Sequence, residues 1–147
     1  LFYLGICRFQ QQDLVGAQLV FDKLSRDIPL NEVLSNFGVT QSRLNQPEAL
    51  ATLEKVIESE PGDPVYLFNL GYALWKRGRF EEGAKRLQDV LDRDPNDQEA
   101  KELLSRCERK SPWRAQDVRM EGLERLKYEY EETAYRQLQS MLKAEKL

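Results

Sequence analysis

The chain has 147 residues, with 22 basic and 25 acidic side chains, a net charge of −3 and no histidine. A chain of this length forms one compact domain or one short array of repeats. No uninterrupted apolar run approaches the roughly 18 residues of a membrane-spanning helix, and the first residues lack the pattern of a signal peptide. Basic residues alternate with acidic ones in the last third, so no concentrated basic face exists. We therefore expect neither membrane insertion nor binding to nucleic acid.

The usual equipment of catalysis is missing from the sequence. Without histidine the chain lacks the commonest general base and the commonest zinc ligand. It has no glycine-rich phosphate loop, no Gly-x-Ser-x-Gly motif and no cysteine pair at metal-binding spacing. Cys7 and Cys107 are expected as small packed side chains rather than as a disulfide. The sequence thus predicts a protein that is not an enzyme and that holds no cofactor and no metal.

The predicted elements form helical hairpins that follow one another along the chain. The first hairpin is expected at 1–11 and 13–26, the second at 31–43 and 47–59, and the third at 64–77 and 80–93. In the third, Leu67, Leu70 and Leu74 lie on one helix face, Gly78 supplies the turn, and Pro95 follows the second helix. The expected core comprises Leu4, Ala17, Phe21, Phe37, Ala49, Leu53, Leu70, Leu74, Ala84 and Leu87.

The hairpins recur with a constant period. Gly5 to Gly38 and Gly38 to Gly71 are each 33 residues by subtraction, and Gly71 to Ser105 is 34. In each copy a leucine or phenylalanine directly precedes the periodic glycine, an alanine or glycine lies near the start of the second helix, and a proline follows that helix. One hairpin cannot bury its apolar stripe alone, so neighbouring copies must stack. This pattern resembles the tetratricopeptide repeat family, which implies an all-α solenoid.

On this frame the chain divides into three parts. A repeat array is expected at 1–110, with copies at 1–30, 31–63 and 64–97 and a half repeat at 98–110 whose helix covers 97–110. A short linker follows at 111–114. The remainder, 115–147, is expected as one amphipathic helix over 115–146, because Met120, Leu123, Leu126, Tyr130 and Ala134 are spaced as on one helix face. Leu123 and Leu126 are expected to cap the half repeat near Leu103 and Leu104. The chain does not start with Met, and we expect a fragment or processed product.

A second apolar stripe on the first helices points to a binding surface. In proteins that resemble this one, these helices line the concave face of the solenoid. Asn36 and Asn69 occupy a position at which some family members hydrogen-bond the backbone of a bound peptide, and a side-chain amide can both donate and accept. The family's clamp for C-terminal carboxylates uses Lys, Arg and Asn, whereas here the surface is mostly apolar and an apolar or amphipathic peptide fits better. The predicted groove comprises Phe2, Ile6, Phe9, Asn36, Val39, Phe68, Asn69, Tyr72, Trp75 and Lys76.

These observations support three functions. The first is a non-enzymatic protein–protein interaction module that holds a peptide in its concave groove, with Phe68, Tyr72 and Trp75 partly accessible. The second is a structural assembly protein that self-associates, for example as a homodimer, through the C-terminal helix at Tyr130, Ala134, Leu138 and Met141. The third is a secretion chaperone of the repeat type. The aromatic residues could instead pack against the next repeat or the tail. The stripe of Tyr130, Ala134, Leu138 and Met141 could likewise lie in the chain's own groove or on a partner instead of on a second copy. The sequence does not identify the cellular compartment of the protein, and it slightly favours the cytoplasm.

Overall fold

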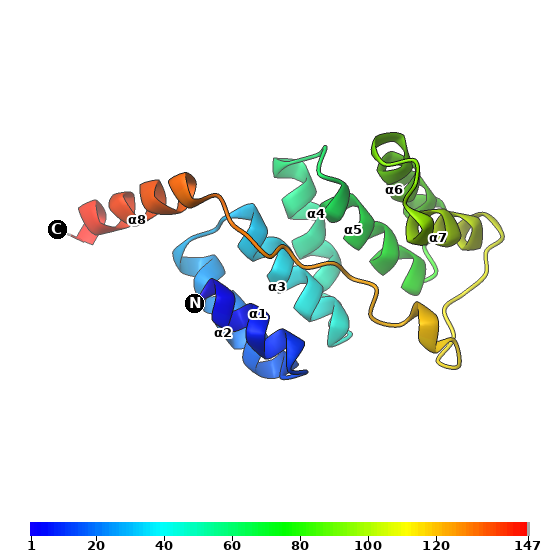
Figure 1. Cartoon of the computed structure of the whole chain (residues 1–147), viewed down its shortest axis with the longest axis horizontal. Coiled ribbons are helices and arrows are strands. Elements are labelled where there is room, and N and C mark those ends of the chain that lie inside the picture. Colours follow the sequence, from blue (N-terminus) through cyan, green and yellow to red (C-terminus); the bar gives the residue numbers. More distant parts are fainter. Residues whose placement is uncertain (147) are drawn as a thin grey trace.

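The computed structural model describes the backbone of residues 1–146 and the side chains of residues 1–144. Within this part of the chain there are eight α-helices, one short 3-10 helix and no strand (Figure 1). The helices are α1 Phe2–Gln10, α2 Leu14–Asp27, α3 Asn31–Arg43, α4 Ala49–Ser59, α5 Pro64–Lys76, α6 Phe80–Arg93, α7 Gln98–Glu108 and α8 Glu132–Lys146, and the 3-10 helix η1 spans Val118–Met120. The all-α solenoid that the period of the sequence predicts is confirmed, and the bounds of α1 to α7 agree with prediction to within two residues.

The hairpins share one turn conformation. The residue that ends the turn after the first helix has a left-handed backbone in every copy: Gln12, Asn45, Gly78 and Lys110 have φ angles of 66°, 58°, 76° and 53°. Glycine adopts this conformation without steric cost, which explains Gly78 in the best-formed copy. The first helix of the third copy and α7 begin with an aspartate cap. The Asp63 carboxylate accepts from the backbone of α5, and Asp97 accepts from the Ala100 N–H of α7.

The two helices of each hairpin approach closely at the periodic glycines. A Cβ atom on Gly71 would lie 2.8 Å from Cγ of Leu87, so any side chain there would force the helices apart. Gly5 and Gly38 have the same relation to Phe21 and Leu53. Most of the expected core is buried, as predicted: Ala17, Phe21, Ala49, Leu53, Leu70, Leu74 and Leu87.

The expected core was wrong at three positions. Phe37 and Ala84 are half-buried at the margin of the core. Leu4 is 42% exposed. Its counterparts in later copies, Phe37 and Leu70, lie on helices that pack against a preceding helix, α3 against α2 and α5 against α4. In the part of the chain that the structure describes, α1 packs against α2, which follows it, and Leu4 is left exposed.

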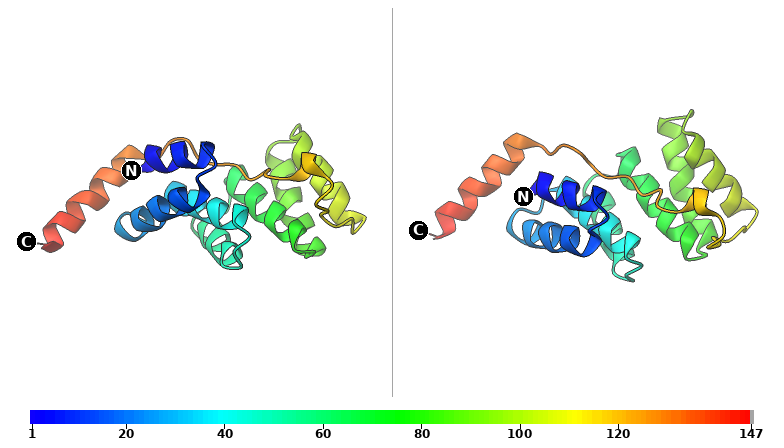
Figure 2. Two further views of the ribbon diagram at one scale, coloured as in Figure 1. Left: turned by 90° about the horizontal axis from the view of Figure 1, so that it is seen from below. Right: turned by 60° about the horizontal axis from the view of Figure 1, so that its bottom comes forward.

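The predicted helix over 115–146 was wrong in its first half. After η1 the backbone runs extended from Glu121 to Glu131, and α8 begins only at Glu132. We call residues 121–131 the strap. It crosses the faces of α5 and α3 and ends beside α1, and α8 then projects beyond the α1–α2 end of the solenoid (Figures 1 and 2). Gly122 has a φ of 67°, which does not occur in a right-handed α-helix. The contacts of this segment with the repeats outweigh the helical periodicity of its sequence.

The hydrophobic core consists of two buried clusters. The C-terminal cluster joins α4 to α7 and includes Leu103 and Met120. The N-terminal cluster joins α1 to α3 and includes Phe2, Phe21 and Leu126. Leu123 packs against the C-terminal cluster and Leu126 belongs to the N-terminal cluster, so the expectation that both cap the half repeat was wrong. The strap therefore contributes to both clusters.

No helix in the described part of the chain combines the length and the apolar character that crossing a membrane would require.

The repeat frame makes a direct prediction for Leu70. Its side chain is 1% exposed within the C-terminal cluster, so Leu70→Ala should lower the free energy of unfolding by about 2–5 kcal/mol through lost burial and the cavity left behind. Urea denaturation followed by circular dichroism measures this change. A loss below about 1 kcal/mol would be inconsistent with a core position.

Candidate functional site

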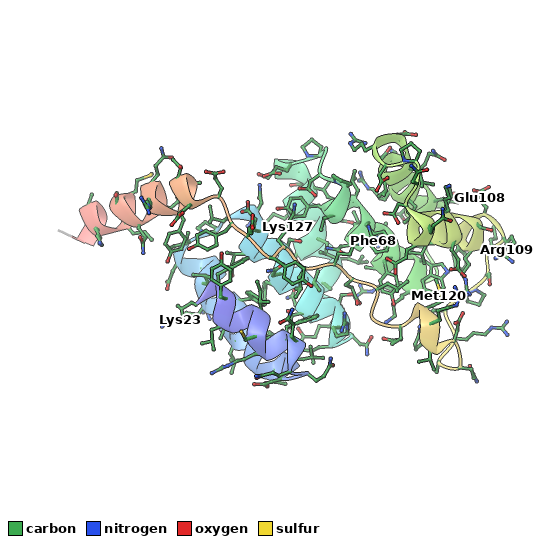
Figure 3. The ribbon with its side chains drawn as sticks, viewed as in Figure 1. Lys23, Phe68, Glu108, Arg109, Met120 and Lys127 are labelled. Atoms are coloured by element: carbon green, nitrogen blue, oxygen red, sulfur yellow. The ribbon has the colours of Figure 1, made fainter. Side chains whose placement is uncertain are left out.

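The predicted groove residues lie together on α1, α3 and α5, beneath the strap. Phe2, Ile6 and Phe9 come from α1, Asn36 and Val39 from α3, and Phe68, Asn69, Tyr72, Trp75 and Lys76 from α5. Phe68, Tyr72 and Trp75 are 0% exposed, so the expectation that they are partly accessible was wrong. The segment that follows α7 contacts all three: Phe68 lies under Arg125, Tyr72 bonds the Met120 carbonyl and Trp75 bonds the Ser111 carbonyl. Figure 3 shows Phe68 beside the path between Met120 and Lys127.

Two asparagines hold the backbone of the strap. Asn69 donates from Nδ2 to the Arg125 carbonyl at 2.8 Å and accepts from the Arg125 N–H at 2.7 Å. Asn36 binds the carbonyl and N–H of Lys127 in the same way, at 2.9 and 2.8 Å. We call each such double hydrogen bond an asparagine clamp. Together the clamps satisfy the backbone polar groups of alternate residues in a segment that has no strand partner.

The two cationic side chains of the strap, Arg125 and Lys127, meet acidic and aromatic groups. Arg125 forms a two-pronged ion pair with Asp97, with N–O distances of 2.7 and 3.0 Å, and lies 3.5 Å from the centre of the Phe68 ring. Lys127 Nζ lies 2.7 Å from the Asp63 carboxylate and 5.0 Å from the centre of the Tyr66 ring. In an extended segment residues two apart face the same side, so these cations lie side by side along one wall.

Glu124 points to the opposite wall and is buried. Its carboxylate accepts from the Ser42 hydroxyl at 3.0 Å and from Arg43 Nε at 2.9 Å. Arg43 also donates to the Gly122 carbonyl at 3.1 Å. A buried charge is stable only when it is paired and hydrogen-bonded, and Glu124 meets both conditions. Ser42 and Arg43 were not among the predicted groove residues.

The segment that leads into the strap is anchored by two aromatic residues of α5. The Tyr72 hydroxyl donates to the Met120 carbonyl at 2.5 Å, and Trp75 Nε1 donates to the Ser111 carbonyl at 2.8 Å. Burial raises the pKa of the Tyr72 hydroxyl far above its usual range, and the charges of Glu124 and Glu121 add to this effect. Tyr72 therefore stays protonated and acts as a hydrogen-bond donor. Lys76, the predicted groove cation, pairs with Glu121 at 3.2 Å.

The residues predicted for self-association separate into two environments. Tyr130 is half-buried, with its ring centre 5.1 Å from that of Phe2. Ala134 and Leu138 are half-buried on α8, against the N-terminal cluster. Met141 is 60% exposed. Because the strap ends beside α1, Tyr130, Ala134 and Leu138 lie against the chain's own first repeat.

Sequence reasoning missed the strap as a component of the groove. Glycine and proline are the strongest local signals of non-helical structure in a sequence. The strap contains no proline, so Gly122 was the available sign that a helix through residue 122 is unfavourable. The long side chains of Glu124, Arg125 and Lys127 were interpreted as a solvated helix face, whereas they form the ion pairs described above. Charge alternation alone cannot distinguish these two environments.

Among the described residues, no group of three or more acidic or cysteine side chains is arranged to hold a metal ion. Cys7 is exposed and Cys107 is buried, and both are free thiols. Burial raises the pKa of the Cys107 thiol to about 11, which keeps it protonated. The described site offers contacts for binding an extended chain.

Comparison with known families identifies the scaffold. Residues 47–107, which span α4 to α7, match a family model described as tetratricopeptide repeat. This segment is a tetratricopeptide repeat. A search of curated proteins found no match. The match agrees with the resemblance drawn from the periodic glycines. Tetratricopeptide repeats are in general modules that bind other proteins.

The matched tetratricopeptide-repeat segment contains half of the groove that holds the strap. Asn69, Phe68 and the aspartate caps Asp63 and Asp97 lie within it, whereas Asn36 lies on α3, before residue 47. The structure shows the same helical hairpin on both sides of this boundary, with the same turn conformation and the same close contact at glycine.

Gly122→Ala should loosen the strap selectively. A left-handed alanine costs about 1–2 kcal/mol, and its Cβ would lie 3.3 Å from Cζ of Arg43. Hydrogen exchange at the Arg125 and Lys127 amides, which the clamps protect, should therefore accelerate about 5–30-fold. Gly78→Ala is the matched control, because it is equally left-handed but has no atom within 4 Å of the new Cβ. Equal acceleration in both variants would show that the effect is general destabilisation.

Stability should depend on pH through Asp97. The hydrogen bond from Arg125 lowers the pKa of the Asp97 carboxyl, against the opposing effect of burial. A lowered folded-state pKa stabilises the fold above the unfolded pKa, roughly 3.9, and this contribution is lost as pH falls through the folded value. The stability advantage of the wild type over Asp97→Asn, measured by urea denaturation, should shrink below pH ~4. Asparagine also caps helices, so the variant isolates the charge. A constant difference from pH 6 to pH 2 would contradict the assignment.

Proposed function

We propose that this protein is a non-enzymatic protein–protein interaction module whose concave groove binds an extended peptide, and that the strap occupies the groove when no partner is bound. The observation that carries the proposal is the pair of asparagine clamps. Each clamp binds the N–H and the carbonyl of one residue, at Arg125 and at Lys127. These groups are present in every non-proline residue, so the clamps suit any extended chain.

The way in which the strap is attached supports its exchange for a partner. Between α7 and α8 the chain has only the short helix η1, and the strap forms no secondary structure of its own. Its release would therefore break contacts with the groove without unfolding a helix of the repeats. The ion pairs with Lys76 and Glu99 are partly exposed and individually weak.

The α8 helix also fits an exchange. Its contacts with the repeats involve half-buried side chains, Ala134, Tyr135, Leu138 and Leu142, at the edge of the N-terminal cluster. Figure 2 shows α8 extending away from the body of the solenoid in both views. A partly buried helix opposes release of the strap less strongly than a fully packed one would.

The proposal is tested with a labelled peptide of residues 119–131 added to the full chain. In the wild type the tethered strap competes, so binding should be weak. In the Gly122→Ala chain the groove residues are unchanged and the strap is loosened, so the peptide should bind about 5–30-fold more tightly, as measured by fluorescence anisotropy. Adding Asn36→Ala and Asn69→Ala to this chain should remove binding.

Two controls make the outcome decisive. The Gly78→Ala chain should bind the peptide no better than the wild type, because its strain lies in the turn between α5 and α6. Hydrogen exchange should show that the Gly122→Ala strap is loosened under the conditions of the binding assay. If the strap is loosened and the peptide still does not bind, the groove is a structural contact surface and the proposal fails.

A further inference from the structure

The strap cations are bound by the same pair of side chains in two successive repeats. Arg125 is bound through its backbone by Asn69 and through its side chain by Asp97. Lys127 is bound through its backbone by Asn36 and through its side chain by Asp63. Asn36 and Asn69 are 33 residues apart, and Asp63 and Asp97 are 34 apart, by subtraction. The repeat period of the solenoid thus corresponds to a step of two residues along the bound segment.

Each aspartate has a second role as a helix cap. Asp63 begins α5 and Asp97 begins α7, and both accept backbone N–H groups while they bind the strap. The cap fixes the carboxylate in place before a ligand arrives, so little side-chain freedom is lost on binding. The groove therefore presents a fixed carboxylate to the side chain at position 125 and another to that at position 127. Leu126 between them packs in the N-terminal cluster.

The wall that binds these cations carries more negative charge than the strap neutralises. Glu99 adds a second carboxylate beside Arg125, at 2.8 Å. Near Lys127, burial raises the pKa of the Tyr66 hydroxyl, and the charges of Glu32, Glu60 and Asp63 raise it further, so three carboxylates lie near the tyrosine whose ring Lys127 contacts. The strap then adds Glu129 and Glu131, which line the same surface hollow as Glu32. Like charges at this end weaken the fit of the strap.

We infer that the partner bound by this groove is an extended basic segment of another protein, with Arg or Lys at alternate positions aligned with Arg125 and Lys127 and a further cation in place of Glu129. This inference rests on the proposed function and specifies its ligand. A partner of this kind keeps both asparagine clamps and the ion pairs with Asp97 and Asp63, and pairs the surplus carboxylates. A second copy of the chain carries the same Glu129, so its strap has no advantage over the tethered one.

The test compares three peptides of residues 119–131 on the full-length Gly122→Ala chain. The first has the strap sequence, the second carries Glu129→Lys, and the third exchanges Arg125 with Leu126, which keeps composition and net charge but moves one cation to the opposite face. The Glu129→Lys peptide should bind about tenfold or more tightly than the strap sequence, and the exchanged peptide about tenfold or more weakly, as expected for gained and lost charge-assisted contacts.

The aspartates provide the matched test on the side of the protein. Asp63→Asn and Asp97→Asn retain the helix caps and remove one charge each. Asp97→Asn should reduce the preference for Arg over Gln at position 125 to the part that Glu99 and Phe68 supply, and leave the preference for Lys over Gln at position 127 unchanged. Asp63→Asn should reduce only the preference at position 127. Circular dichroism confirms that each variant is folded. Such a crossed pattern cannot arise from a general loss of stability.

The two proposals fail in different ways. If no peptide binds the loosened chain, the proposed function itself is wrong. If all three peptides bind equally, the groove binds extended chains through their backbone, and the inference of a basic partner is overturned while the proposed function stands. If the Glu129→Lys peptide binds no better than the strap sequence, the surplus negative charge has no part in selecting a partner, which also overturns the inference.

Discussion

The structure depends on the backbone of an extended segment finding hydrogen-bond partners on a purely helical surface. Helices satisfy their own backbone groups and so offer few partners to another chain. Asn36 and Asn69 solve this problem with side-chain amides, each of which binds one strap residue through both its N–H and its carbonyl. Without them the N–H and carbonyl groups of Arg125 and Lys127 would be covered by protein without partners, at a cost of about 1–3 kcal/mol for each group.

Once the backbone is held, the strap joins two hydrophobic clusters that the repeats form separately. Met120 belongs to the cluster of α4 to α7, and Leu126 to the cluster of α1 to α3. Stacked repeats interact mainly with their nearest neighbours, so their cooperativity falls with distance along the array. A segment that contacts all three hairpins adds interactions between repeats that are not adjacent. The state of the strap therefore affects the stability of the whole solenoid as well as access to its groove.

The same side chains shape the repeats and bind the strap. Asp63 and Asp97 cap helices and pair with strap cations, and Phe68, Tyr72 and Trp75 fill space between the solenoid and the strap. Phe68 lies against Arg125 of the strap, Tyr72 bonds Met120 and Trp75 bonds Ser111, so the segment after α7 takes part in burying all three. Release of the strap would expose a large apolar surface to water. Soluble proteins rarely leave such a surface uncovered, so another segment is expected to take the place of the strap. This constraint couples release of the strap to binding of another segment.

The sequence alone determined the scaffold, because helical hairpins of constant length leave a periodic record. Gly5, Gly38 and Gly71 mark close contacts between helices that are local in sequence, and Asn36 and Asn69 could be selected by their shared place in the repeat. The path of residues 115–131 could not be found in this way. The spacing of Met120, Leu123 and Leu126 fits a helix, and only the tertiary structure decided otherwise. Backbone partners from α3 and α5 and charge partners from the caps of α5 and α7 stabilise the extended form, and these lie 28 to 91 residues away along the chain.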